Sequence, residues 1–128
     1  QPGLYNRGFH STGIAGAMAC GAACAKLMGL DRCGVYNSVS LAAIQSSGLI
    51  IIDESGQRCK PINPANAARI GVLSALMAER GLLSSQNPLE SKKGWFHAFT
   101  DHVDETILLG GLGVGSCVAS QKRKDTQH

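Results

Sequence analysis

The stretch GIAGAMACGAACA, residues 13–25, is apolar, consists mostly of Gly and Ala, and is followed by Lys26. It is typical of a helix that packs closely against its neighbours. Because each Gly lowers helix stability by about 1 kcal/mol relative to Ala, tertiary packing must hold such a helix together. The stretch is too short and too rich in Gly to span a bilayer. It therefore predicts a buried helix of a soluble protein, and no contact with a membrane, rather than a membrane-associated segment.

Local signals predict where this helix begins and ends. Ser11 or Thr12 can cap its start, and we expect its end at about Leu27 or Met28, with Gly29 as the stop signal. Small residues recur at helical spacing in two adjacent rows, Gly13, Ala17 and Gly21, and Gly16, Cys20 and Cys24. These rows predict that neighbouring helix backbones approach closely.

The rest of the chain predicts further helices. We expect one helix from Asp31 to about Ser46 and another from Pro64 or Ala65 to Gly81. A further helix is expected to start at Asn87–Pro88 and to carry Trp95, Phe96 and Phe99 as core residues. The last expected helix is capped by Asp101 and carries Ile107, Leu108 and Leu109. Residues 1–11 are expected to be irregular, and Leu49–Ile52 to form a buried extended linker or a short strand. No other segment could complete a sheet, so the predicted fold class is all-α with one core.

The helix expected before Gly81 has two candidate packing faces. Its apolar face consists of Ile70, Leu73, Leu76 and Met77, and a second row of small residues consists of Ala67, Gly71 and Ala75. Large apolar side chains at this spacing usually face a core. The small row predicts close contact with another helix.

Length and composition narrow the class of protein. The chain has 128 residues, a net charge of +3 and only 5% aromatic residues. This length fits one domain, and a basic stripe interleaved with aromatic side chains is missing, so nucleic acid is not expected as a partner. We expect residues 1–113 to form a helical domain and residues 114–128, which include Lys122-Arg123-Lys124, to be a polar tail that is disordered or divergent.

The cysteines and the first residue bear on the cellular compartment. Five cysteines, at positions 20, 24, 33, 59 and 117, form no Cys-x-x-Cys pair. An odd number without such spacing predicts neither a disulfide framework nor a zinc site, and favours a reduced, cytoplasmic protein. The sequence shows no signal peptide pattern, and because it starts at Gln rather than Met, we expect it to be a processed or excised piece.

Two short motifs each place a polar side chain just before an expected helix. The first is Gly8-Phe9-His10-Ser11-Thr12-Gly13, and the second is Lys60-Pro61-Ile62-Asn63-Pro64-Ala65-Asn66-Ala67-Ala68. Helix N-termini present unpaired N–H groups and partial positive charge, which suit carboxylates. A His at one helix start and a Lys at the other predict a pocket for a polyanionic small molecule.

The same residues also fit purely structural roles. His10 could simply be buried or capping, and Lys60 could be a surface lysine beside a turn. Capping accounts for Ser11, Thr12 and Asn66. His97 and His102 are five residues apart and do not share a helix face, so both are assigned to structure or surface. Neither a Ser-His-Asp order, a metal cluster nor a phosphate-binding Gly-Lys-Ser/Thr motif is present.

The two motifs, with others between and after them, resemble the MmgE/PrpD family. Besides Gly8-Phe9-His10 and residues 60–71, the resemblance includes Ala25-Lys26-Leu27-Met28-Gly29-Leu30-Asp31, Ala42-Ala43-Ile44-Gln45-Ser46-Ser47-Gly48-Leu49, Ala78-Glu79-Arg80-Gly81 and Gly94-Trp95-Phe96-His97-Ala98-Phe99. Order and spacing hold from about Tyr5 to Leu112. The stretch from Val114 to His128 does not resemble the family.

The resemblance implies a fold, a chemistry and site residues. The family includes 2-methylcitrate dehydratase, cis-aconitate decarboxylase and iminodisuccinate epimerase, which act on small di- or tricarboxylates without a required metal or cofactor. Its members combine a large all-α domain with a smaller α+β lid and are usually homodimers. His10 and Lys60 match two basic active-site positions. Ser11 and Thr12 could hydrogen-bond substrate, and so could Asn63, which stands where many members have a titratable His.

The chain is therefore expected to be part of the large helical domain of an MmgE/PrpD-type lyase or isomerase. Upstream helices with an Asp and a His of the site, and the lid, are not in the sequence, so little turnover is expected from these residues alone. Dehydration, decarboxylation and epimerisation stay open as reactions. The alternative is a non-catalytic helical module, derived from the family and used only for association. Apolar surfaces toward missing helices would favour self-association.

Overall fold

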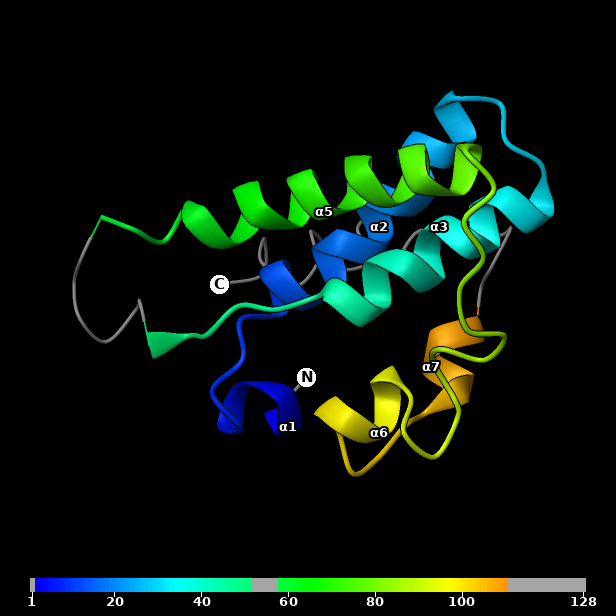
Figure 1. Cartoon of the computed structure of the whole chain (residues 1–128). Helices are drawn as coiled ribbons and strands as arrows, with labels where there is room; N and C mark the ends of the chain where they lie inside the picture. The colour runs from blue at the N-terminus through cyan, green and yellow to red at the C-terminus, as the bar shows by residue number, and fades with distance from the viewer. Residues whose placement is uncertain (1, 52–57, 111–128) are drawn as a thin grey trace.

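A computed structural model describes residues 2–51 and 58–110 of the chain. Its helices are α1 (Pro2–Asn6), α2 (Ser11–Leu27), α3 (Arg32–Gln45), α5 (Ile62–Glu79), α6 (Trp95–Phe99) and α7 (Glu105–Leu109) (Figure 1). Within these ranges the only strand-like pairing is an isolated bridge between Phe9 and Leu49. The predicted all-α fold is confirmed, and the predicted tail over 114–128 lies outside the described residues.

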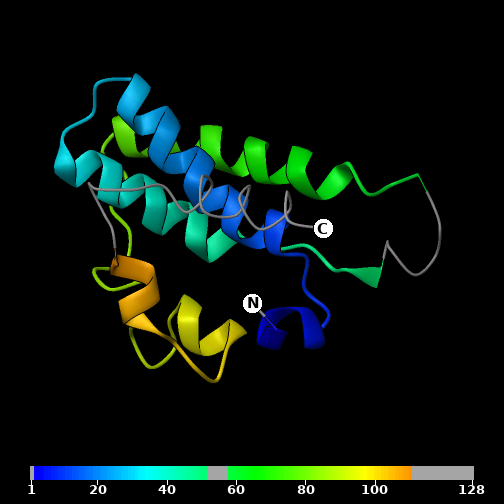
Figure 2. The ribbon, with the colours of Figure 1, turned by 180° about the vertical axis from the view of Figure 1, so that it is seen from behind.

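The three long helices α2, α3 and α5 lie side by side, and α1, α6 and α7 lie along one side of them (Figures 1 and 2). Helix α2 contacts both α3 and α5, and these two also contact each other. The centre of the core contains Ala17, Ala42, Ala67 and Ile70, with Met18 packed against them. The small side chains predicted in α2 and α5 therefore form the contact between these helices.

Two glycines allow this close packing. A Cβ on Gly71 of α5 would come within 2.4 Å of the Cys20 Cβ and 2.7 Å of the Gly21 backbone nitrogen in α2. A Cβ on Gly21 would meet the Ser38 carbonyl and hydroxyl oxygens of α3 at 3.2 Å. Ser38 is fully buried, and its hydroxyl donates to the Gly21 carbonyl at 2.8 Å. Both contacts confirm that the helix backbones approach closely.

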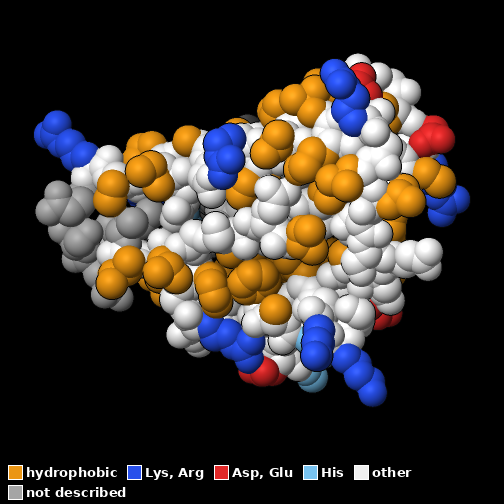
Figure 3. Space-filling view, in the orientation of Figure 1, with side chains coloured by type: hydrophobic (Ala, Val, Ile, Leu, Met, Phe, Trp, Pro, Cys, Tyr) orange, Lys and Arg blue, Asp and Glu red, His pale blue; other side chains and the backbone are white. Residues whose placement is uncertain are grey.

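The apolar face predicted for α5 is only partly correct. Ile70 is buried, but Leu73 is 40% and Leu76 45% exposed, whereas the row of Ala67, Gly71 and Ala75 is buried. The small row is buried because it lets the α5 backbone lie directly on α2, which turns the leucines away. Figure 3 shows hydrophobic side chains gathered over α5 and in a band beneath it.

The ends of the long helices follow the sequence signals with small differences. Asp31 caps α3 by accepting from the Gly34 N–H at 2.8 Å, and Gly29 takes the predicted left-handed conformation with φ 74°. Neither Ser11 nor Thr12 is the N-cap of α2, because that position belongs to His10, which makes no side-chain capping bond. Helix α5 begins at Ile62, two residues before Pro64. Pro64 is tolerated in the first turn because N–H groups in a first turn lack helical partners, so the missing N–H of proline costs no hydrogen bond.

The segment between α5 and α6 differs from the expected helix. Asn87 and Pro88 start a series of turns, and α6 begins only at Trp95, whose N–H donates to the Pro88 carbonyl at 2.8 Å. Gly94 explains the interruption: a Cβ there would lie 2.7 Å from the Leu89 carbonyl oxygen. Only Gly permits this close turn before the aromatic helix.

The short helices also correct two expectations. Residues 2–6 form α1 rather than irregular structure, and α7 is capped by Asp104, not by Asp101. Asp101 instead pairs with Arg7, which also donates to the Ala98 carbonyl at 3.1 Å. Through Arg7, the segment after α1 is attached to the end of α6.

The aromatic residues predicted for the core lie outside it and form a separate half-buried cluster. Phe9 and Phe99 form an edge-to-face pair with ring centroids 4.8 Å apart, and Trp95 contacts Phe99 at 5.1 Å. The indole N–H of Trp95 donates to the Ser46 hydroxyl at 3.0 Å, just after the end of α3. His97 and His102 are exposed, in agreement with a surface assignment.

The residues after α3 are not buried as expected. Leu49 is 57% and Ile51 59% exposed, and the proposed strand is reduced to the single bridge with Phe9. Ile52 lies outside the described residues. Within residues 2–51 and 58–110, no helix combines the length and apolar character that crossing a membrane requires.

Candidate functional site

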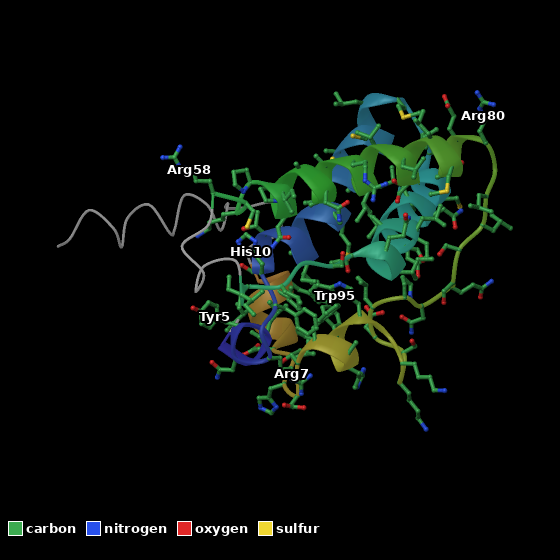
Figure 4. All side chains as sticks on the ribbon, turned by 60° about the vertical axis from the view of Figure 1, so that its left-hand side comes forward. Tyr5, Arg7, His10, Arg58, Arg80 and Trp95 are labelled. Atoms are coloured by element: carbon green, nitrogen blue, oxygen red, sulfur yellow. The ribbon has the colours of Figure 1, made fainter. Side chains whose placement is uncertain are left out.

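His10 occupies the residue immediately before α2. Its backbone is extended, with φ −86° and ψ 110°, and its carbonyl accepts the Ile14 N–H at 3.1 Å. A short antiparallel pairing fixes the residue: the His10 N–H donates to the Gly48 carbonyl at 2.9 Å, and the Ile50 N–H donates to the Gly8 carbonyl at 2.8 Å. The backbone that carries the half-buried imidazole is therefore fixed at the N-terminal end of α2, close to where α5 begins (Figure 4).

Asn63 joins the first turn of α5 to this site. Its side chain is buried, and its amide nitrogen lies 3.1 Å from the His10 Nδ1 atom. The same nitrogen donates to the Leu49 carbonyl at 3.0 Å. Two residues 53 positions apart in the sequence are thus in direct contact. The site is built from the starts of α2 and α5 together with residues 48–50.

Two glycines make room for Asn63. Gly48 has φ +140°, and a Cβ there would meet the Asn63 side-chain amide atoms at 3.1 to 3.2 Å. A Cβ on Gly13 would lie 2.7 Å from the Ser47 carbonyl oxygen and 3.4 Å from the Asn63 Cβ. Because both positions lack side chains, α2, the segment after α3 and α5 can converge on the amide.

Lys60 lies in the turn that leads into α5. Its side chain is exposed, and its carbonyl accepts the Asn63 N–H at 3.4 Å. The Lys60 backbone is therefore coupled to the residue that contacts His10. Arg58 in the same turn extends away from the helices, at the opposite end of α5 from Arg80 (Figure 4). The two cations in this turn place positive charge before the N-terminus of α5.

The other predicted contacts occupy the first turn of α2. Ser11 is half-buried and Thr12 exposed, and both follow His10 directly. N–H groups in a first helical turn lack carbonyl partners one turn earlier, so this end of α2 carries partial positive charge. The donors and the helix N-terminus at the start of α2, together with Lys60 in the turn before α5, suit a carboxylate.

Sequence reasoning singled out His10 and Asn63 separately but missed their contact. It also missed the roles of the Leu49 carbonyl and Gly48, because the partner of a backbone oxygen depends on the fold and not on the residue type. The Gly48-Leu49 step after a helix end was the available signal. Among the described residues, no group of three His, Cys, Asp or Glu side chains is placed to hold a metal ion.

A separate cavity of about 340 Å³ lies between the end of α3 and α6. Its walls consist of Ala43, Ile44, Ser46, Pro88, Lys93, Gly94, Trp95, Ala98 and Phe99. The lining is largely apolar, and the two polar groups of the Trp95–Ser46 hydrogen bond satisfy each other. Its wall contains neither His10 nor Lys60.

Nearly all of the described chain matches a known protein family. The family model described as the MmgE/PrpD N-terminal domain matches residues 2–107. The chain belongs to the MmgE/PrpD family. This match extends over α1, α2, α3, α5 and α6, and it confirms the family resemblance that the motifs indicated.

Two curated relatives of the chain come from Aspergillus species. The chain is 33% identical over 93 residues to a cis-aconitate decarboxylase-like protein, oryM, of Aspergillus oryzae. It is 32% identical over 93 residues to a cis-aconitate decarboxylase of Aspergillus terreus. Each alignment covers 73% of this chain and 19% of the relative. The chain thus corresponds to about a fifth of the length of these proteins.

Proposed function

We propose that this chain forms part of the carboxylate-binding site of a cofactor-independent lyase or isomerase of the MmgE/PrpD family. The observation that carries the proposal is the contact between His10 and Asn63 at 3.1 Å, which joins the starts of α2 and α5. Family membership supports the enzyme class, and the names of the two fungal relatives support cis-aconitate as the first substrate to test.

Electrostatics supports a carboxylate as the ligand. Helix α2 has 17 residues, with no acidic residue in its first turn, and α5 has 18 residues, also without one. Each helix N-terminus carries about half a positive charge, which favours a bound anion. Lys60 adds a full charge in the turn before α5. A di- or tricarboxylate can contact both helix N-termini at once, whereas a monocarboxylate can contact only one.

The proposed chemistry begins with removal of a proton, or of carbon dioxide, next to a carboxylate. In a decarboxylation, the bond to one carboxyl carbon breaks, its electron pair stays on the neighbouring carbon, and a proton then takes the place of the carbon dioxide. His10 would contact a carboxylate or move a proton, and Lys60 would bind a carboxylate and stabilise developing negative charge. Ser11 and Thr12 would add hydrogen bonds to the substrate.

Isothermal titration calorimetry of the 128-residue chain tests the proposal. We expect saturable binding of cis-aconitate, much weaker binding of acetate, and affinity that falls as salt is added. Lys60→Gln should weaken binding about tenfold, the loss of one charge-assisted contact. Lys26→Gln, an exposed change near the far end of α2, serves as the control. Equal affinity for acetate and cis-aconitate, or an unaffected Lys60 variant, would reject the proposal.

A second candidate function is association without catalysis. Val72, Leu73 and Leu76 of α5 are 40 to 46% exposed, and Leu83 beyond it is 77% exposed. Such a surface favours contact with another chain or copy, and a homodimer would bury it. Sedimentation equilibrium separates the candidates: a dimer that ignores cis-aconitate supports association alone, whereas saturable binding supports the carboxylate site.

A further inference from the structure

The orientation of the Asn63 amide is determined by its surroundings. The Leu49 backbone oxygen can only accept a hydrogen bond, so the amide atom 3.0 Å from it must be the nitrogen. That nitrogen carries two hydrogens. One is directed to the Leu49 oxygen, and the other to the His10 Nδ1 atom 3.1 Å away. Both donors of Asn63 are therefore used inside the protein, which leaves no N–H for a substrate carboxylate.

The contact fixes which nitrogen of His10 carries the proton. Because Asn63 donates to Nδ1, Nδ1 must offer its lone pair, and the neutral ring then holds its hydrogen on Nε2. The side chain of Asn63 has little freedom to change this arrangement. It is 8% exposed, and the Gly48 backbone lies against its amide group.

The geometry points to Asn63 as a positioning residue that holds His10 in the tautomer with the hydrogen on Nε2. This inference rests on the proposed function for one step only, the presence of a carboxylate at His10. Given that ligand, Nε2 donates a hydrogen bond to it. His10 does not remove the substrate proton, because in this tautomer the lone pair lies on Nδ1 and is taken by Asn63. Of the two roles open to His10, the structure favours the carboxylate contact.

Nitrogen-15 NMR of the imidazole side chains tests the inference without any ligand. The chain has four histidines, and the variant His10→Gln identifies the His10 signals by their disappearance. In the wild type at slightly alkaline pH, we expect His10 to show a protonated Nε2 and an acceptor Nδ1. Asn63→Asp replaces the donor by a carboxylate oxygen, so Nδ1 should then carry a proton. A wild-type His10 with its hydrogen on Nδ1, or a folded Asn63→Asp variant with an unchanged ring, would overturn the inference.

A second measurement covers the case in which the Asn63→Asp variant does not fold. In the wild type, one hydrogen of the Asn63 side-chain amide should form a hydrogen bond to the Leu49 carbonyl oxygen, and the other should form one to the His10 Nδ1 atom. His10→Gln should shift only the latter signal. If neither hydrogen signal shifts in His10→Gln, the contact between Asn63 and His10 is contradicted.

Ligand binding separates this inference from the proposed function. At the same slightly alkaline pH, Asn63→Asp should weaken cis-aconitate binding about tenfold or more, because a neutral ring with its hydrogen on Nδ1 has none on Nε2 to donate. Asn66→Asp adds the same charge one helical turn later, where Asn66 contacts Arg69 instead, and serves as the matched control. A wild type with the expected tautomer and no affinity for cis-aconitate would reject the proposed function and leave the positioning role intact. A wild type that binds cis-aconitate but has its His10 hydrogen on Nδ1 would reject the positioning role and leave the proposed function intact.

Discussion

Gly71 of α5 lies so close to Cys20 of α2 that a Cβ on the glycine would be 2.4 Å from the Cys20 Cβ and 2.6 Å from its sulfur. The next atom in the way is the Gly21 backbone nitrogen at 2.7 Å, which cannot move without shifting α2. The crossing of the two longest helices therefore depends on the absence of a side chain at Gly71. Both segments of the candidate site, before α2 and before α5, are positioned by this crossing.

Gly71→Ala should destabilise the protein by about 3 kcal/mol or more, because a methyl group at this crossing forces the helices apart. Gly16→Ala is the matched control. Its Cβ would meet the Ala67 Cβ at an ordinary 3.5 Å, so the gain in helix propensity should stabilise the chain by about 1 kcal/mol. Urea denaturation measures both changes. Equal effects of the two substitutions would argue against the close crossing.

The cap of α3 gives a second prediction. Asp31 accepts the Gly34 N–H at 2.8 Å, so Asp31→Ala should lower the free energy of unfolding by about 1 kcal/mol. Asp31→Asn keeps an acceptor oxygen at this position and should cost much less. Thermal unfolding followed by circular dichroism compares the variants. If Asn and Ala were equally damaging, the hydrogen bond would not be the cause.

Ser46 relays a hydrogen bond between α3 and the aromatic cluster. Its hydroxyl donates to the Ala43 carbonyl at 2.9 Å and accepts from the Trp95 indole at 3.0 Å. Ser46→Ala should cost about 1 to 2 kcal/mol and change the emission of Trp95, the only tryptophan of the chain. The exposed neighbour Ser47 provides the control Ser47→Ala. Identical emission in wild type and Ser46→Ala would exclude the relay.

Cysteine reactivity gives a fourth prediction. Burial, together with the neighbouring Cys24 thiol 3.8 Å away, raises the pKa of Cys20 above its ordinary value of 9.0. The folded thiol thus holds its proton more tightly than the unfolded one. Its contribution to stability is present below pH 9.0 and is lost as the pH rises through the raised value.

Alkylation with iodoacetamide at a pH of about 8, followed by peptide mass spectrometry, measures this difference. Cys33 is exposed and should react first, and Cys20 should react more slowly, since the thiolate is the reactive form. Faster reaction at Cys20 than at Cys33 would contradict the packing of α2 against α5.

The long helices could be predicted because their signals are local. Asp31 and Gly29 mark helix ends through their own backbone and side-chain chemistry, and the structure confirms both. The short elements could not, because tertiary contacts decide them. Asp101 is a good cap by type, but Arg7 pairs with it, and Asp104 takes the cap of α7.

The face of α5 and the candidate site show the same limit. Hydrophobicity alone favours Leu73 over Gly71 as the buried residue, yet the short distance between helices selects the glycine. His10, Lys60 and Asn63 could be named from their motifs. The hydrogen bond between His10 and Asn63 depends on how α2 and α5 cross, which no local pattern specifies.

We propose that a carboxylate binds where α2 and α5 begin. The most direct test is a two-dimensional amide NMR spectrum of the 128-residue chain titrated with cis-aconitate, with acetate as the control. We expect saturable shifts confined to residues 8–13, 48–50 and 60–66, and their loss in Lys60→Gln. A dispersed spectrum without shifts there, or with shifts centred on the cavity beside Trp95, would contradict it.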